Sequence, residues 1–226
     1  MGIDYTKRPT SAPSASPSTA ASAQQPAVNL SKISLTKSAP VVSLTKPGES
    51  QGMMRVNLNW STGKRGLFGG GHAIDLDLGC LYELTDGSKG VIQALGNSFG
   101  SEHAPPYICL DGDDRSGTVA GGENMHINLA QPQLFRRILI FAMIYSGAAN
   151  WAAVDGVVTL YPTAGPPVEV RLDSPVNGAA ICAIAQVYYA QGALHVHREV
   201  NYINGSQRQL DDAYQWGLRW QTGRKS

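Results

Sequence analysis

The sequence predicts an all-β fold, an antiparallel β-sandwich of two sheets with Greek-key-like connections. Many short segments alternate apolar and polar residues with a period of two, and clusters of Gly, Pro, Asn, Asp and Ser separate them at short intervals. Helical periodicity is almost absent. Together these features are typical of sandwiches built from many short strands.

The chain divides into two regions of different composition. Residues 1–29 consist largely of Ser, Ala, Pro, Thr and Gln and hold almost no large apolar side chain. Such a segment cannot bury enough surface to offset the entropy of ordering, so we predict a disordered tail. Residues 30–226 are long enough for one β-sandwich domain with a proper core.

The expected strands follow the alternation of apolar and polar residues. In chain order they are 33–37, 41–46, 53–60, 73–84, 91–95, 125–129, 134–145, 154–161, 168–172, 179–189 and 193–203. Residues 85–88 and 191–192 have the composition of tight hairpin turns. One short helix is expected over 206–213, and residues 216–220 are expected to close the domain.

Composition and charge argue against several kinds of partner and site. The formal net charge is +1 at pH 7, which gives no reason to expect nucleic acid or an anionic membrane as the main partner. No apolar run approaches the length of a transmembrane segment. The three cysteines are far apart and odd in number, so neither a disulfide framework nor a zinc pair is expected. With no secretory signal evident, a cytoplasmic location is predicted.

An acidic, glycine-rich stretch is the strongest candidate site. It reads LDGDDRSGTVAGGE over residues 110–123 and places Asp111, Asp113 and Asp114 within four positions. Carboxylates this close repel one another, and Ca²⁺ is a fitting countercharge because it takes roughly six to eight oxygen ligands from flexible loops. Asp and Gly also dominate ordinary tight turns, so an acidic turn is an equal alternative for this stretch alone. The EF-hand pattern does not fit, since Gly122 stands where it requires glutamate.

A second acidic element lies on an expected strand. Asp75 and Asp77 flank Leu76, so both carboxylates should point to one face. The apolar side chains of Ile74, Leu76 and Leu78 should point to the other. Two aspartates on a strand are costly to bury unless they are paired or bind a cation. A solvent-facing strand edge is the simpler alternative, but the presence of two acidic elements favours calcium.

Other chemistries find less support in the sequence. His195 and His197 share one face of an expected strand, which suits Zn²⁺, but no third ligand is evident and an outward polar face explains them better. The chain has neither a phosphate-binding glycine loop nor a GxSxG nucleophile motif. Its carboxylates do not flank an aromatic-rich cleft, as those of glycosidases do. We therefore expect a protein that is not an enzyme.

Several motifs in combination resemble the TerD family of tellurium-resistance proteins, in particular its TerA-like members. The matching segments are ISLTK and VSLTK within 33–46, VNLNW at 56–60, IDLDL at 74–78, GDDRSG at 112–117 and Glu123. They correspond to the family's paired “SLxK…VSLTK” start, its “vgLgWd” strand and its “DLDas”, “GDNxTG” and “GDGDDE” motifs. The resemblance spans roughly residues 31–203 and extends the prediction to a TerD-like β-sandwich domain.

The resemblance implies a calcium site whose ligands carry over position by position. They are Asp75, Asp77, Asp113, Asp114 and Glu123, with Asn97 from a neighbouring loop and Gly112 and Gly117 supplying backbone shape or carbonyl groups. Asp111 is an additional acid of this chain that would compensate for missing ones. Where the family has “GDGDDE”, residues 120–123 read AGGE and lack several carboxylates. We therefore expect one calcium ion rather than two.

The same resemblance implies a bacterial stress-response protein of the tellurium-resistance type, acting as a non-catalytic binding or scaffold module in a larger complex. Its partners would be other tellurium-resistance or stress-complex proteins, in the cytoplasm or at the inner face of the membrane. Two alternatives stay open. One is a calcium-independent structural interaction protein, and the other is a calcium-dependent module for a ligand such as a carbohydrate. The second would present exposed aromatic rings beside the acidic loop, where Tyr107 is the nearest.

Overall fold

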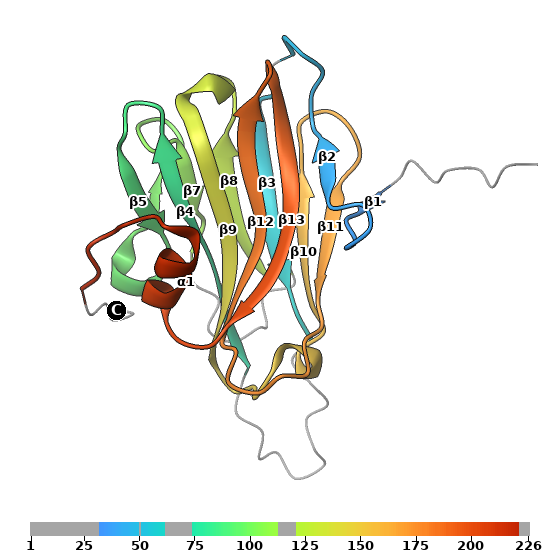
Figure 1. Cartoon of the computed structure of the whole chain (residues 1–226), viewed down its shortest axis with the longest axis vertical. Helices are drawn as coiled ribbons and strands as arrows, with labels where there is room; N and C mark the ends of the chain where they lie inside the picture. Colours follow the sequence, from blue (N-terminus) through green and yellow to red (C-terminus); the bar gives the residue numbers. More distant parts are fainter. Residues whose placement is uncertain (1–31, 50, 62–73, 113–120, 222–226) are drawn as a thin grey trace, which may run out of the picture.

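Two β-sheets pack face to face in the structure, a computed structural model that describes residues 32–49, 51–61, 74–112 and 121–221 (Figure 1). The antiparallel β-sandwich predicted from the sequence is confirmed. The predicted disordered tail, residues 1–29, lies outside the described residues.

The first sheet has seven strands within the described segments. In spatial order they are β1 (Ile33–Ser34), β11 (Val168–Leu172), β10 (Gly156–Tyr161), β3 (Met53–Asn59), β8 (Glu123–Asn128), β7 (Ile108–Leu110) and β6 (Gly100–Ser101). β1 runs parallel to β11, and the other neighbours are antiparallel. The two-residue strand β6 falls in a region predicted as loop.

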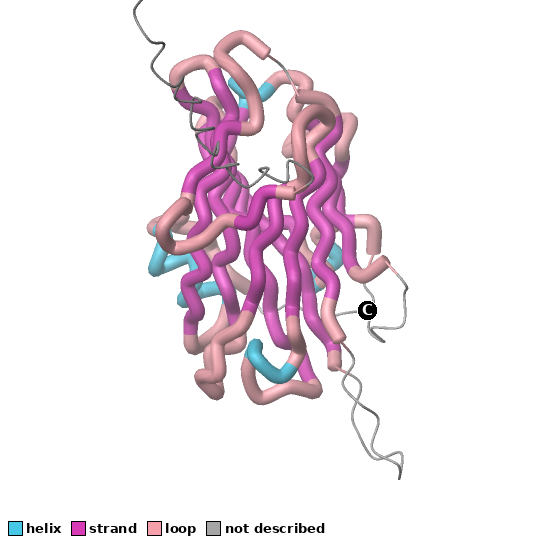
Figure 2. The backbone as a smooth tube through the Cα atoms, turned by 90° about the vertical axis from the view of Figure 1, so that its right-hand side faces the viewer, coloured by secondary structure: helices cyan, strands magenta, loops and turns pink. Residues whose placement is uncertain are grey.

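The second sheet has six strands in the part of the chain that the structure describes. They are β2 (Val41–Ser43), β13 (Ala193–Ile203), β12 (Ile181–Ala190), β9 (Phe135–Ser146), β4 (Asp75–Leu84) and β5 (Lys89–Ile92), all antiparallel. β3 lies between β8 and β10, and β9 lies between β4 and β12, so the central strands pair with partners distant in sequence. The edge formed by β1 and β2 faces the viewer in Figure 2.

The helical elements are short. They are η1 (Leu95–Asn97), η2 (Pro132–Leu134), η3 (Trp151–Ala153) and α1 (Gln207–Tyr214). The predicted helix is confirmed as α1, which begins after Ser206 because the Ser206 hydroxyl accepts a hydrogen bond from the Arg208 amide and Gln209 caps the Ser206 amide. Among the described residues, no helix is long and apolar enough to cross a membrane.

The inner faces of the two sheets form the main core. Every second residue of β8 and of β10 is buried, which is the alternation that predicted these strands. The predicted hairpin turns are also present. Gln191 and Gly192 both have positive φ angles, of 53° and 79°, as a two-residue hairpin loop requires. Asp86 holds the other turn by accepting hydrogen bonds from the Ser88 amide and hydroxyl.

A second, outer core covers β4 and β9, which are buried on both faces. Its members are Leu81, Leu139, Phe141, Met143, Ile181, Ala183, Leu210 and Trp216. Trp216 belongs to the segment that follows α1. Residues 216–220 are expected to close the domain, and this segment covers the outer face of the sheet. Gly79 is required here, because a Cβ at this position would lie 2.5 Å from the Phe141 ring.

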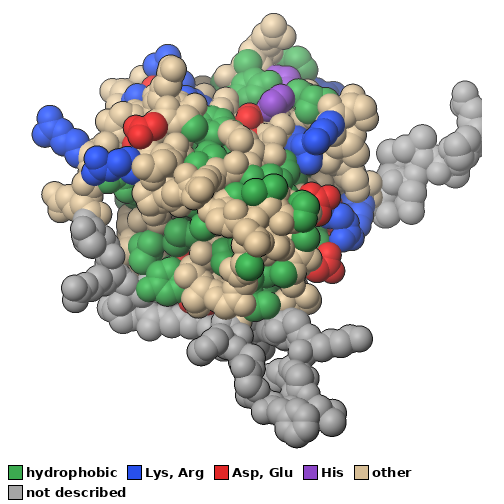
Figure 3. Space-filling view, turned by 60° about the horizontal axis from the view of Figure 1, so that its bottom comes forward, with side chains coloured by type: hydrophobic (Ala, Val, Ile, Leu, Met, Phe, Trp, Pro, Cys, Tyr) green, Lys and Arg blue, Asp and Glu red, His purple; other side chains and the backbone are tan. Residues whose placement is uncertain are grey.

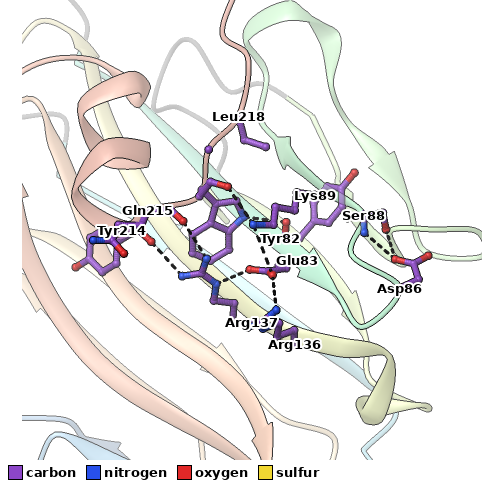
Figure 4. Close-up of polar contacts among 12 residues, drawn as sticks. Tyr82, Glu83, Asp86, Ser88, Lys89, Arg136, Arg137, Tyr214, Gln215 and Leu218 are labelled. Atoms are coloured by element: carbon purple, nitrogen blue, oxygen red, sulfur yellow. Dashed lines mark hydrogen bonds and ion pairs between the residues drawn. The ribbon is translucent and has the colours of Figure 1, made fainter.

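A cluster of charged side chains around the buried Glu83 fastens this cover to the sheet (Figure 4). Glu83 is 2% exposed and accepts hydrogen-bond or ion-pair contacts from Arg137 at 2.7 Å, Arg136 at 3.1 Å and Lys89 at 3.6 Å. The Arg137 guanidinium in turn lies 3.8 Å above the Trp216 ring. Burial alone would raise the pKa of Glu83, but the hydrogen bond from Arg137 and the three positive charges hold that pKa below its usual value.

We expect Glu83→Gln to lower the free energy of unfolding by about 2 kcal/mol at pH 7, the scale of hydrogen bonds to a charged group. The pKa of Glu83 is lower in the folded than in the unfolded state, so its stabilisation is present above pH ~4.3 and is lost as the pH falls. Chemical denaturation of both proteins from pH 7 to pH 3 should therefore show the difference shrinking in acid. Asp212→Asn, on the exposed face of α1, is the control; a difference independent of pH would contradict the assignment.

Candidate metal centre

The predicted acidic positions of β4 are buried, not solvent-facing. Asp75 is 5% exposed and Asp77 is 3% exposed, which excludes the simple alternative of an exposed strand edge. Leu76 and Leu78 belong to the core between the sheets, as the alternation predicts. Asp77 is paired with Met143, a member of the outer core, so it lies toward the outer side of β4.

Glu123 brings a third buried carboxylate to this strand from the opposite sheet. It is the first residue of β8, is 3% exposed and accepts a 2.7 Å hydrogen bond from the backbone amide of Leu78. β5 pairs with β4 only from Cys80 onward, so the edge of β4 is open at Leu78 and its amide needs another acceptor. The Glu123 carboxylate therefore lies against the peptide that joins Asp77 and Leu78.

Asn57 fixes the turn that presents Glu123. Its side-chain amide donates to the carbonyl of Gly121 and, at 3.4 Å, to that of Glu123. Gly122, between them, has a φ angle of 64°, and a Cβ there would lie 2.1 Å from the carbonyl oxygen of Leu58. Only glycine permits this close approach to β3. Sequence reasoning placed Asn57 in a family motif but did not assign it this role.

Trp60 fixes the start of β4. Its indole Nε1 donates a 3.2 Å hydrogen bond to the carbonyl of Ile74, and the side chain is 7% exposed. The end of β3 and the start of β4 are thus joined directly before Asp75. β4 and β8 both begin at the lower end of the sandwich in Figure 1. Seen from that end, charged side chains lie mostly toward the rim and apolar and uncharged ones toward the middle (Figure 3).

Asp111 lies on the other face of its sheet from Glu123. Leu110 and Met125 face the core, so the alternation directs Asp111 and His126 to the outer face of their sheet. There the Asp111 carboxylate lies 3.2 Å from Nε2 of His126. Glu123, by contrast, shares the inner face with Met125.

The remaining predicted positions divide into two groups. Asn97 ends η1 with a φ angle of 55° on an exposed stretch, and Gly112 follows Asp111 with open space where a Cβ would stand. Asp113, Asp114 and Gly117 lie outside the described residues. Among the residues that the structure does describe, no group of three or more His, Cys, Asp or Glu side chains could hold a metal ion by itself.

The two histidines of β13 make local contacts at the surface of the strand. His195 contacts the Ser43 hydroxyl at 3.0 Å and stacks on Tyr188, and His197 contacts the Glu199 carboxylate at 2.8 Å. These local partners agree with the outward polar face expected for them.

The thiols are poorly suited to nucleophilic chemistry. Cys80 and Cys182 are fully buried, and burial raises the pKa of both. Burial, followed by the charges of Asp111 and Glu102, also raises the pKa of the half-buried Cys109. A raised pKa lowers the thiolate fraction, which is the reactive form.

The aromatic ring proposed for a carbohydrate site does not stand free. Tyr107 is half-buried and packs against the main core. Tyr107 is thus less exposed than the carbohydrate alternative expects, and that alternative stays a prediction.

Comparison with known proteins supports the family suggested by the motifs. No protein-family model matches the chain. Over 204 residues the chain is 46% identical to the tellurium resistance protein TerA of Alcaligenes sp., a match that covers 88% of this chain and 60% of that protein. The chain thus spans about three fifths of the length of this curated relative.

Two solved structures share the fold at low sequence identity. A protein of unknown function, SAV2460, superposes with a TM-score of 0.52 and 16% identity, over 70% of this chain and 93% of its own. A homologue of telluride resistance protein (TerD), SCO6318 from Streptomyces coelicolor A3(2), gives a TM-score of 0.50 and 19% identity, over 69% and 92%. The sequence match over most of the chain carries the assignment, and the structures agree with it in fold. The chain belongs to the tellurium-resistance family of TerA and TerD.

Proposed function

We propose that this chain is a calcium-binding, non-catalytic module of a tellurium-resistance system. The observation that carries the proposal is the burial of Asp75, Asp77 and Glu123 at one end of the sandwich, with Glu123 held against β4. Buried carboxylates are tolerated when a cation offsets their desolvation and mutual repulsion. An all-oxygen donor set suits a hard cation such as Ca²⁺ better than Zn²⁺.

The ligand set would combine these carboxylates with the acidic loop. Asp113, Asp114 and Gly117 precede Glu123 by ten, nine and six residues in the sequence, and Asn57 holds the turn that begins at Gly121. One ion is the number that the available carboxylates support, because calcium affinity falls as charged ligands are lost. Bound there, it would connect β4 of one sheet to the start of β8 in the other.

The role in resistance would be that of a binding or scaffold component. The matched relative is a tellurium resistance protein. It is longer than this chain and contains parts that this chain does not match. The poorly reactive thiols argue against direct reduction of tellurium oxyanions by this chain. We therefore propose that it acts through other tellurium-resistance or stress-complex proteins, in the cytoplasm or at the inner face of the membrane.

Calcium should raise the thermal stability of chelator-stripped protein, because a ligand that binds only the folded state stabilises it. The expected gain is about 2.7 kcal/mol at a hundredfold excess over the dissociation constant. Thermal melts with calcium, with magnesium and with neither would measure it. A rise in melting temperature that is specific to calcium would support the site. An unchanged melting temperature up to millimolar calcium would contradict the proposal and favour a calcium-independent interaction protein.

Glu123→Gln should weaken the response to calcium while keeping an acceptor for the Leu78 amide. Removing one charged ligand lowers affinity, so the calcium-dependent rise in melting temperature should shrink markedly. The melting temperature without calcium should stay equal or rise, since a buried negative charge is removed.

Asp111→Asn is the matched control for that variant. It also removes one carboxylate from the acidic stretch, but from the outer face beside His126, and should leave the calcium response unchanged. A calcium response lost in Asp111→Asn but intact in Glu123→Gln would show that the ligand assignment is wrong.

A further inference from the structure

A cavity of about 320 Å³ opens at the edge of the sandwich that faces the viewer in Figure 2. Its walls come from the connection between β1 and β2, from β11 of one sheet and from β13 of the other. Three cationic side chains line it, one from each of these elements: Lys37, Arg171 and Arg198. The volume lies at the small end of the range for small-molecule sites, roughly 300–1,000 Å³.

The walls of this cavity are held by backbone hydrogen bonds to both sheets. The Leu35 amide donates to the carbonyl of Glu169 on β11 at 3.1 Å. The Arg198 amide of β13 donates to the carbonyl of Pro40 at 2.7 Å. The connection that carries Lys37 is therefore fixed at both ends, so the cations are presented on a preformed frame.

The acids at the cavity are already engaged. Glu169 lies 2.8 Å from the Lys32 ammonium and makes only a longer contact, of 3.6 Å, with Arg171. The Asp173 carboxylate accepts a hydrogen bond from the Tyr202 hydroxyl. The Tyr202 hydroxyl is neutral and leaves the charge of Asp173 in place, and Arg171 also lies 3.6 Å from the Asp155 carboxylate. Positive charge is still in excess at the cavity, because Lys37, Arg171 and Arg198 line it against the carboxylates of Glu169 and Asp173.

Two of the cations have no acidic partner. Among the described residues, neither Lys37 nor Arg198 lies within ion-pair distance of a carboxylate. Arg198 is a half-buried residue of the wall, so part of this long side chain is packed against the protein without a countercharge beside it. An anion in the cavity would supply what both groups lack.

We propose that this cavity binds a small oxyanion, by charge-assisted hydrogen bonds from Arg198 and Arg171 and by the charge of Lys37. Guanidinium groups match the oxygens of phosphate-like groups in geometry as well as charge. The Thr36 hydroxyl, also in the wall, adds a polar group. A phosphate group and a tellurite ion share this chemistry, and the site does not depend on calcium.

Isothermal titration calorimetry would test the proposal on the calcium-free chain of 226 residues in Tris chloride at constant ionic strength. Sodium phosphate and sodium tellurite are titrated separately, each against a sodium chloride reference. We expect saturable binding of at least one oxyanion. In Arg198→Gln the affinity should fall about tenfold or more, because one hydrogen bond to a charged group is lost. Tighter binding of phosphate would indicate a phosphorylated metabolite as the source, and tighter binding of tellurite would indicate the oxyanion itself.

Two further variants keep the test decisive. Arg219→Gln, an exposed arginine away from the cavity, should bind as the unmodified chain does. Arg171→Gln should weaken binding without loss of stability, because 61% of the Arg171 side chain is exposed. Reaction of tellurite with the Cys109 thiol would be the same in every variant, so only heat that depends on the arginines counts. The absence of saturable heat with both oxyanions, or equal affinity in Arg198→Gln, would overturn the proposal.

Discussion

The hydrogen bond from the Leu78 amide to the Glu123 carboxylate joins the two sheets at the end where β4 runs past β5. An amide on an open strand edge within a sandwich needs an acceptor, and within the described segments β5 pairs with β4 only from Cys80 onward. A glutamate from the facing sheet meets that need, but it also buries a negative charge next to Asp77. The proposed cation site thus lies where the two sheets are joined.

The supports of this arrangement are spread along the chain. Asn57 holds the turn before β8, and Trp60 holds the start of β4, so the carboxylates from both sheets are placed by β3. At the other end of β4, Glu83 and the arginines of β9 fasten the segment after α1 over the outer core. β4 is therefore fixed at both ends and on both faces, which keeps its acidic positions out of water.

Local patterns predicted most of the fold. Strands such as β8 and β10 alternate strictly between buried and half-buried positions, and the hairpin turns use residues suited to positive φ, so a period of two and turn chemistry were sufficient. The outer core was missed because β4 and β9 are buried on both faces and show no alternation. The burial of Asp75 and Asp77 and the role of Asn57 depend on contacts with residues far away in sequence, which no local pattern contains.

The cationic cavity illustrates the same limit for function. Lys37, Arg171 and Arg198 are separated by long stretches of sequence, and each alone is an ordinary surface cation. They converge because β1 pairs with β11 in one sheet and β2 pairs with β13 in the other, with the connection between β1 and β2 crossing the gap. The proposed cation site also forms where the two sheets meet. Both proposed sites therefore depend on the packing of one sheet on the other, and neither is contained in a single segment of the sequence.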